Sequence, residues 1–112
     1  MSDHALDEGL LGELVQAIVA AVRPEKVILF GSWATGTARP DSDIDLFIQV
    51  PSGQDTAKAS ALAYAAIRPL RPRLRRGVDI VVKDRAFVEY YGDLVGTIVR
   101  PVLREGRLLH AS

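Results

Sequence analysis

Residues 26–50 read KVILFGSWATGTARPDSDIDLFIQV. The apolar run 26–30 ends at a glycine, which is typical of a buried strand. The stretch 42–50 then alternates in character, which indicates a second strand with one face carrying Ile44, Leu46, Ile48 and Val50 and the other carrying Asp43, Asp45, Phe47 and Gln49. The segment between the two runs is too short for a crossover helix, so the sequence predicts that the two strands are antiparallel.

The residues on either side of this pair predict helices. Before it, apolar residues recur every fourth position, which predicts a helix capped by Ser2 or Asp3 and ended by Pro24; these residues are Leu6, Leu10, Leu14, Ile18 and Val22. After it, Asp55 is expected to cap a helix over 56–67, which Pro69 ends. The next segment, RPLRPRLRRG, is expected to be a basic connection broken by prolines.

The last third of the chain predicts one more inner strand and two helical pieces. The run VDIVVK at 78–83 is typical of a strand, and residues 85–91 are expected to form a helical turn capped by Asp84. A final helix ends at Gly106 and is marked by Leu94, Ile98, Val102 and Leu103, with a short edge strand RLLH after it. The order of elements predicts an α/β (α+β) fold, a small mixed sheet flanked by helices.

Composition limits the classes of protein that this chain can belong to. With 112 residues, of which 48% are hydrophobic, residues 1–112 are expected to form a single domain. Fourteen basic residues balance fourteen acidic ones, so no direct DNA binding is expected, and the absence of cysteine excludes a disulfide framework. The start of the chain lacks a basic signal-peptide region, and no apolar run approaches the ~20 residues of a membrane span, so the expected location is the cytoplasm.

Two closely spaced aspartates suggest a cation site. Asp43 and Asp45 are two residues apart on a strand, so they project from one face, roughly 7 Å apart at the backbone. Carboxylates this close repel, so either one of them has a raised pKa or a cation lies between them, and Mg²⁺ or Mn²⁺ suits such hard oxygen ligands. Asp41 follows Pro40 and is expected to belong to a turn.

Two other motifs nearly match this stretch and are excluded. An EF-hand loop that starts at Asp41 would need Gly at its sixth position and Glu at its twelfth, where this chain has Leu46 and Ser52. The spacing of Gly31 and Gly36 is that of a phosphate-binding P-loop, but the required lysine is missing because Thr37 follows.

The remaining pattern is Gly31-Ser32, ten intervening residues, and Asp-x-Asp on a strand. It resembles the signature of the DNA polymerase β-like nucleotidyltransferases, and most of all that of their smallest members, the minimal nucleotidyltransferases. Asp79 in GVDIVV lies where that family has its third carboxylate, on a later strand. The ending GTIVRPVLREGRLLH is similar to the family's last helix and strand, so the resemblance covers almost the whole chain.

The resemblance implies a chemistry for these residues. A nucleotidyltransferase of this kind transfers AMP, or another NMP, from ATP or another NTP to a hydroxyl group. Asp43, Asp45 and Asp79 would be the catalytic ligands of two Mg²⁺ ions, with Mn²⁺ as a substitute, and Asp79 would also accept the hydroxyl proton. Gly31 would let the backbone approach the nucleotide, and Ser32 would contact its β- and γ-phosphates.

The resemblance also implies a partner. Minimal nucleotidyltransferases of this kind resemble the antitoxins of two-gene toxin–antitoxin modules. In such a module the antitoxin transfers AMP to a tyrosine of its partner, a HEPN-type ribonuclease toxin. Two alternatives stay open: an antitoxin that neutralises its toxin by binding alone, and a transferase that modifies a small molecule such as an antibiotic. A homo-oligomer or a hetero-oligomer is compatible with the sequence.

Two groups of residues have more than one interpretation. The basic cluster in 68–76 is either a solvated surface or a contact for triphosphate, RNA or an acidic partner; its members are Arg68, Arg71, Arg73, Arg75 and Arg76. The larger aromatic residues either belong to the core or stack on a base; they are Trp33, Tyr64, Tyr90 and Tyr91. His4 and His110, near the ends of the chain, are expected on the surface.

Overall fold

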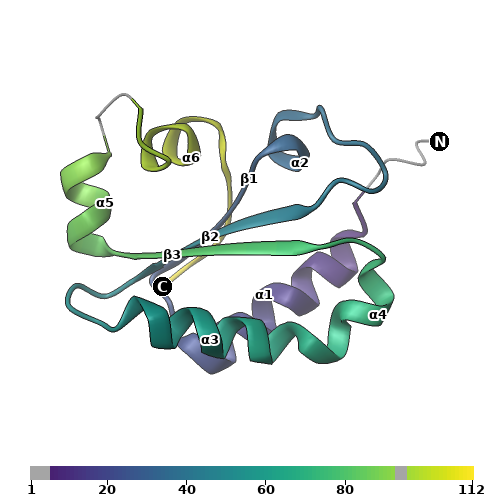
Figure 1. Ribbon diagram of the computed structural model, residues 1–112, viewed down its shortest axis with the longest axis horizontal. Coiled ribbons are helices and arrows are strands. Elements are labelled where there is room, and N and C mark those ends of the chain that lie inside the picture. The colour runs from purple at the N-terminus through teal and green to yellow at the C-terminus, as the bar shows by residue number, and fades with distance from the viewer. Residues whose placement is uncertain (1–5, 93–95) are drawn as a thin grey trace.

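A four-stranded mixed sheet forms the centre of the molecule (Figure 1). The computed structural model describes residues 6–92 and 96–112. In these residues the strand order is β3-β2-β1-β4, with β1 at Lys26–Phe30, β2 at Ile44–Val50, β3 at Val78–Asp84 and β4 at Arg107–Ala111. β2 is antiparallel to β1, as predicted, and parallel to β3, and β4 is antiparallel to β1. β3 was expected inside the sheet but lies at its edge, and its apolar character reflects the one face on which Val78, Ile80 and Val82 are buried in the core. The predicted α/β fold with a mixed sheet is confirmed.

Helices cover both faces of the sheet (Figure 1). One face carries α1 (Glu8–Val22), α3 (Thr56–Ile67) and the short α4 (Arg71–Leu74). The other face carries α2 (Ser32–Thr35), α5 (Arg85–Tyr91) and α6 (Val99–Glu105). In the view of Figure 1, α2 lies apart from α5 and α6, towards the end of the sheet at which β1 finishes.

The alternation along β2 creates two separate cores. Ile44, Leu46, Ile48 and Val50 are fully buried in the larger core beneath α1 and α3. Phe47, from the opposite face, is fully buried in a smaller core with residues of β1, α5 and α6, namely Ile28, Val88, Val99 and Val102. On the face of β2 that carries Asp45, apolar side chains therefore cover the part around Phe47 and leave the rest of the face without such a cover.

The predicted N-terminal cap of the first helix was wrong. Ser2 and Asp3 lie outside the described residues, and α1 begins at Glu8, where the Asp7 side chain accepts a 3.0 Å hydrogen bond from the Leu10 amide. An aspartate one position before a helix satisfies an amide that has no partner within the helix. Periodicity alone placed the start of the helix too early, because Leu6 continues the apolar spacing without being helical.

The basic connection after α3 is helical rather than broken by its prolines. A single 3₁₀ turn covers Arg68–Leu70, and α4 follows it directly. Pro69 and Pro72 each occupy the first turn of one of these pieces. A proline is tolerated there because its missing N–H would have no partner within the helix.

The C-terminal elements agree with the prediction where the structure describes them. α6 begins at Val99 with Pro101 in its first turn, and Gly106 ends it by donating its amide to the Val102 carbonyl at 2.9 Å. The expected marker Leu94 lies outside the described residues. The predicted edge strand is confirmed as β4, and no helix in 6–92 or 96–112 is long and apolar enough to cross a bilayer.

Asp84 has a larger role than the predicted cap. Its carboxylate accepts the amide of Phe87 at 2.9 Å, which caps α5, and also the amide of Gly53 at 3.1 Å in the turn after β2. These two backbone hydrogen bonds lower the pKa of Asp84, the bond from Phe87 more than the bond from Gly53.

Replacing Asp84 is therefore expected to destabilise the fold in a pH-dependent way. A carboxyl whose pKa is lower in the folded state adds stability above its unfolded pKa of about 3.9, and this stability is lost as the pH falls through the folded value. Asp84→Ala should melt below wild type at pH 7, and the difference should shrink on acidification below about pH 4. Thermal unfolding at several pH values tests this, and a pH-independent difference would contradict it.

Candidate active site

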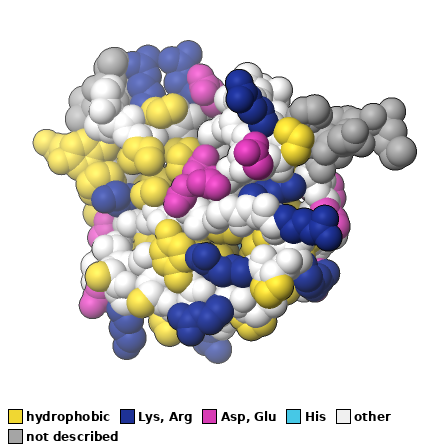
Figure 2. Space-filling view, turned by 45° about the vertical axis from the view of Figure 1, so that its right-hand side comes forward, with side chains coloured by type: hydrophobic (Ala, Val, Ile, Leu, Met, Phe, Trp, Pro, Cys, Tyr) yellow, Lys and Arg dark blue, Asp and Glu magenta, His cyan; other side chains and the backbone are white. Residues whose placement is uncertain are grey.

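The three predicted catalytic aspartates lie at one end of the sheet. Asp45 is the register partner of Phe30, the last residue of β1, and of Asp79 on β3. Paired residues on adjacent strands point to the same face, about 4.8 Å apart at the backbone. Asp43 lies just before β2, so all three carboxylates belong to the region where β1 ends and β2 and β3 begin. Figure 2 shows acidic side chains near the centre of the visible face, with Lys and Arg side chains around them.

Asp45 is the most buried of the three carboxyl groups. It is half-buried, whereas Asp43 and Asp79 are exposed. Burial raises the pKa of Asp45, and the negative charges of Asp79 and then Asp43 raise it further. The expectation that one carboxyl of the pair has a raised pKa is therefore confirmed. A group held in this way is stabilised by either a proton or a cation.

A backbone amide fixes the orientation of Asp43. Its Oδ1 atom accepts a 3.1 Å hydrogen bond from the amide of Gly77, the residue before β3. A Cβ atom on Gly77 would lie 2.7 Å from that same oxygen, so a side chain at this position would displace the Asp43 carboxylate. The Gly77 carbonyl in turn accepts the Ile44 amide at 2.9 Å. Sequence reasoning missed Gly77, although its position directly before the Asp79 strand was a usable signal.

Gly31 lies against the Asp45 carboxylate. Its backbone has φ 73° and ψ −155°, a conformation that only glycine adopts readily. A Cβ atom built at Gly31 would overlap Asp45 Oδ2. Gly31 and the Asp45 carboxylate are thus in contact, and the backbone after β1 reaches the acidic site because this position has no side chain.

Ser32 begins the one-turn helix α2, so its hydroxyl and amide lie at the start of the turn that follows β1. Trp33, the next residue, packs partly buried against the larger core and donates its indole N–H to the Ser42 carbonyl at 2.9 Å. This hydrogen bond ties α2 to the residue before Asp43. The turn and the acidic pair are therefore held together by the side chain of Trp33.

The donor set fits divalent cations in its chemistry. Three carboxylates at one end of the sheet supply hard oxygen ligands, and burial together with the charges of Asp79 and Asp43 raises the pKa of Asp45. As they stand, no three acidic, histidine or cysteine side chains of the described residues 6–92 and 96–112 converge on one metal position. Asp43 is turned towards Gly77 instead. The assignment of Asp43, Asp45 and Asp79 as metal ligands therefore stays a prediction.

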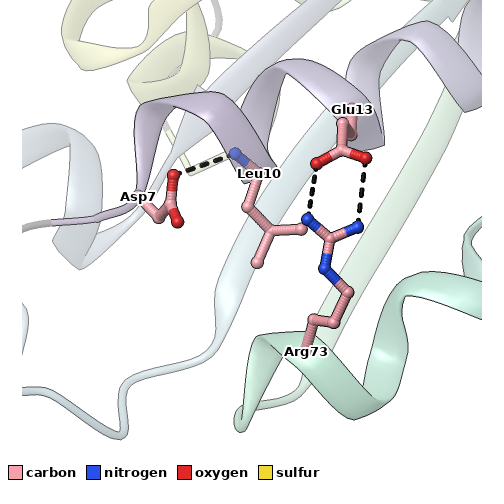
Figure 3. Close-up of polar contacts among 4 residues, drawn as sticks. All are labelled: Asp7, Leu10, Glu13 and Arg73. Carbon is pink, nitrogen blue, oxygen red and sulfur yellow. Dashed lines mark hydrogen bonds and ion pairs between the residues drawn. The ribbon is translucent and has the colours of Figure 1, made fainter.

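The basic cluster is divided by the structure. Arg73 forms a bidentate ion pair with Glu13 of α1, with N–O distances of 3.1 and 2.7 Å (Figure 3). Arg76 lies over the ring of Trp33, with its Cζ atom 4.9 Å from the ring centroid. The side chains of Arg68, Arg71 and Arg75 are exposed. A single description of the cluster as a solvated loop is therefore too simple, because two of its members have specific partners.

The aromatic residues are divided as well. Tyr64 packs against the larger core, and its hydroxyl accepts the Ile80 amide at 2.9 Å, which satisfies an outward-facing group of the edge strand β3. Tyr91 packs against the smaller core and contacts the rings of Phe87 and Tyr90. Tyr90 is 73% exposed. Trp33 has Arg76 over its ring.

A small mixed sheet with acidic residues at one end and a glycine-serine turn beside them has a chemistry that suits phosphate transfer. Residues 11–99 match the nucleotidyltransferase domain family. Because this match spans most of the chain, the protein belongs to the nucleotidyltransferase domain family, and the resemblance seen in the sequence is confirmed. A search of curated proteins finds no significant match.

Solved structures share the fold. A crystal structure of a toxin–antitoxin with AMP-PNP matches with a TM-score of 0.62 and 20% identity over 96% of this chain and 75% of the other. A protein from Sulfolobus solfataricus described as a nucleotidyltransferase matches with a TM-score of 0.60 and 21% identity, covering 89% of this chain and 76% of that one. A mutant of the toxin–antitoxin MntA-HpeT matches with a TM-score of 0.58 and 22% identity over 96% and 75% of the two chains.

Proposed function

We propose that this protein transfers a nucleoside monophosphate, with ATP as the donor of AMP, to a hydroxyl group on a partner protein. The observation that carries the proposal is that three carboxylates and the glycine-serine turn lie together at one end of the sheet. Asp45 and Asp79 are register partners, Asp43 lies beside them, and the Gly31-Ser32 turn contacts Asp45. Family membership supports the reaction type.

Each residue of the site has its own role in the proposed reaction. Gly31 lets the backbone approach the triphosphate, and Ser32 offers its hydroxyl to the β- and γ-phosphates. Asp79 accepts the proton of the attacking hydroxyl, whose oxygen forms a bond to the α-phosphorus. The bond between the α-phosphorus and the bridging oxygen breaks, and pyrophosphate leaves with the electron pair of that bond.

Divalent cations complete the site. Asp43, Asp45 and Asp79 would hold two Mg²⁺ ions, or Mn²⁺ in their place, and such ions neutralise the triphosphate and the charge that develops on the attacking and leaving oxygens. The raised pKa of Asp45 supports this assignment, because a cation would offset both the burial of the carboxylate, which is the larger cause, and the repulsion from Asp79 and Asp43. ATP as the donor is supported by the structural neighbour that contains AMP-PNP, an ATP analogue.

The proposed acceptor lies on a toxin. Two of the structural neighbours are toxin–antitoxin proteins, which supports an antitoxin role for this chain, and the cytoplasm is the proposed location. We propose a HEPN-type ribonuclease as the toxin and one of its tyrosines as the acceptor. The proposed unit is the single domain 1–112.

Transfer to the partner is the direct test. The protein is incubated with α-³²P-labelled ATP, Mg²⁺ and the product of the neighbouring gene, and label is expected on a tyrosine of that product. Asp41→Asn serves as the control variant, since Asp41 is an exposed turn residue two positions before Asp43. Absence of label on the partner under conditions in which the two proteins bind would contradict the proposal.

Ligand binding gives a second expected result. Mg²⁺ with ATP should raise the melting temperature, because a ligand that binds only the folded state stabilises it in proportion to RT ln(1 + [L]/Kd). At a concentration about 100 times Kd this gain is about 2.7 kcal/mol. Asp43→Asn should show much less of it. Equal melting temperatures with and without Mg²⁺-ATP in the wild type would count against a nucleotide site.

A binding-only antitoxin is the second candidate, and one observation favours it. No three metal-ligating side chains converge in the part of the chain that the structure describes. If the protein acts by covering its toxin, the double variant Asp43→Ala/Asp45→Ala should still neutralise the toxin. If transfer is required, the double variant should bind the toxin but leave it active.

A further inference from the structure

Arg76 and Trp33 connect the two sides of the candidate site. Arg76 directly precedes Gly77, whose amide holds Asp43, and Trp33 directly follows Ser32 on α2. The guanidinium carbon of Arg76 lies 4.9 Å from the centroid of the Trp33 ring, within the range of a cation–π contact. This contact therefore joins the turn after β1 to the residues that enter β3.

The contact is part of a closed set of interactions around Asp43. The Trp33 indole donates to the Ser42 carbonyl at 2.9 Å, so Trp33 also holds the residue on the N-terminal side of Asp43. The Gly77 amide holds the Asp43 carboxylate at 3.1 Å, and the Gly77 carbonyl accepts the Ile44 amide on its other side. Movement of the Arg76 side chain would therefore loosen both the residues that lead into β2 and the residues that lead into β3.

One atom of Arg76 lies in an unfavourable environment, which the contact with Trp33 offsets. Its Nε atom is buried and has no hydrogen-bond partner among residues 6–92 and 96–112. A buried donor without a partner is unfavourable, and an arginine at the surface can usually turn its side chain to reach water. Arg71 in the same cluster is exposed. Stacking on Trp33 is the interaction that the structure offers in compensation.

We propose that Arg76 is a positioning residue for nucleotidyl transfer, a role that rests on the proposed function. Through Trp33 and Gly77 it sets the separation between the phosphate-binding turn at Ser32 and the carboxylate of Asp43. It acts on the site through these residues and not through the substrate. Because preorganised geometry accelerates the chemical step, its loss should lower kcat more than it raises KM for ATP.

Trp33 provides a direct readout, since it is the only tryptophan in the chain. In the metal-free protein, Arg76→Met should increase the acrylamide quenching of Trp33 fluorescence, because the ring loses its cover. Arg76→Lys keeps a cation but loses the planar stack, so its quenching should be intermediate. Arg71→Met, the same change at an exposed position of α4, should leave quenching at the wild-type value.

Transfer kinetics test the positioning role itself. Arg76→Met should lower kcat about tenfold with KM for ATP changed less than about threefold, because a tenfold loss, about 1.4 kcal/mol, lies between the sizes of an exposed and a desolvated cation–π contact. Arg76→Lys should recover about half of this loss on a logarithmic scale, and Arg71→Met should match wild type. If Arg76→Met does not fold, the intermediate kcat expected for Arg76→Lys, about threefold below wild type, carries the test.

The outcomes separate this inference from the proposed function. Wild-type transfer together with an unchanged kcat in Arg76→Met and Arg76→Lys would overturn the inference and leave the function intact. A rise in KM alone would also overturn it, because that result indicates a role in binding ATP directly. A wild-type protein with neither transfer nor stabilisation by Mg²⁺-ATP would overturn the proposed function, and the positioning role with it.

Discussion

Asp45→Asn is expected to abolish nucleotidyl transfer and, in the same protein, to raise the melting temperature of the metal-free fold. The loss of transfer should be on the order of 10³-fold or more, the size seen when a charge-stabilising group is removed from a preorganised site. The gain in stability follows from the half-burial of Asp45 between two like charges. An amide of nearly the same shape removes the desolvated charge and the repulsion from Asp79 and Asp43.

The pH dependence of this gain is fixed by the sign of the pKa shift. Asp45 has a raised pKa in the folded state, so the folded protein binds this proton more tightly than the unfolded chain does. Stability due to the protonated group is complete below the unfolded pKa of about 3.9 and is lost as the pH rises through the folded value. The advantage of Asp45→Asn should therefore be absent near pH 3 and reach a plateau above the folded pKa.

Thermal unfolding across this range, without metal, is the measurement. Asp41→Asn removes a carboxylate that is exposed in a turn, so it should show neither the gain in stability nor the loss of transfer. Parallel pH profiles for wild type and Asp45→Asn would contradict the electrostatic explanation. Full transfer by Asp45→Asn would contradict the proposed site.

Gly31→Ala is expected to produce the second large effect, and here stability and activity should fall together. Gly31 combines φ 73° and ψ −155° with a position against Asp45, so an added methyl group meets both backbone strain and the carboxylate. Strain of this kind costs about 1–3 kcal/mol, and overpacking against a fixed neighbour adds about as much again. The expected destabilisation is about 3 kcal/mol or more, with transfer lost because Asp45 is displaced.

Gly36→Ala is the matched control. Gly36 also has a positive φ, 80°, but a Cβ atom there would meet no atom within 4 Å. Its replacement should cost only about 1–2 kcal/mol, the price of the left-handed conformation for a residue with a side chain. Chemical denaturation of both variants gives the comparison, and equal destabilisation would show that contact with Asp45 contributes nothing.

A double-mutant cycle separates strain from contact at Gly31. Asp45→Ala removes the carboxylate that the new methyl group would meet, so Gly31→Ala should cost less in the Asp45→Ala background than in wild type. The remaining cost measures the backbone strain. Additive effects would indicate that Gly31 and Asp45 do not interact.

Local patterns predicted most of the elements because each depends on near neighbours in the chain. The alternation in β2 placed Phe47 and Asp45 on one face, and the short connection made β1 and β2 antiparallel. Asp55 and Asp84 were recognisable as caps, and both accept the amide three residues ahead. The failures were also local: Asp7 instead of Ser2 or Asp3 caps α1, and two first-turn prolines permit helix where a break was predicted.

The sequence by itself determined the order of the elements, the family and the spacing of Gly31, Ser32, Asp43 and Asp45, because these lie within one strand-turn-strand unit whose geometry is set by residues close together in the chain. Only the tertiary structure decided that Asp79 pairs with Asp45, that Gly77 holds Asp43 and that Arg76 covers Trp33. These contacts join segments more than thirty residues apart. Register between distant strands is set by packing of the whole core against α1 and α3, which no local pattern specifies.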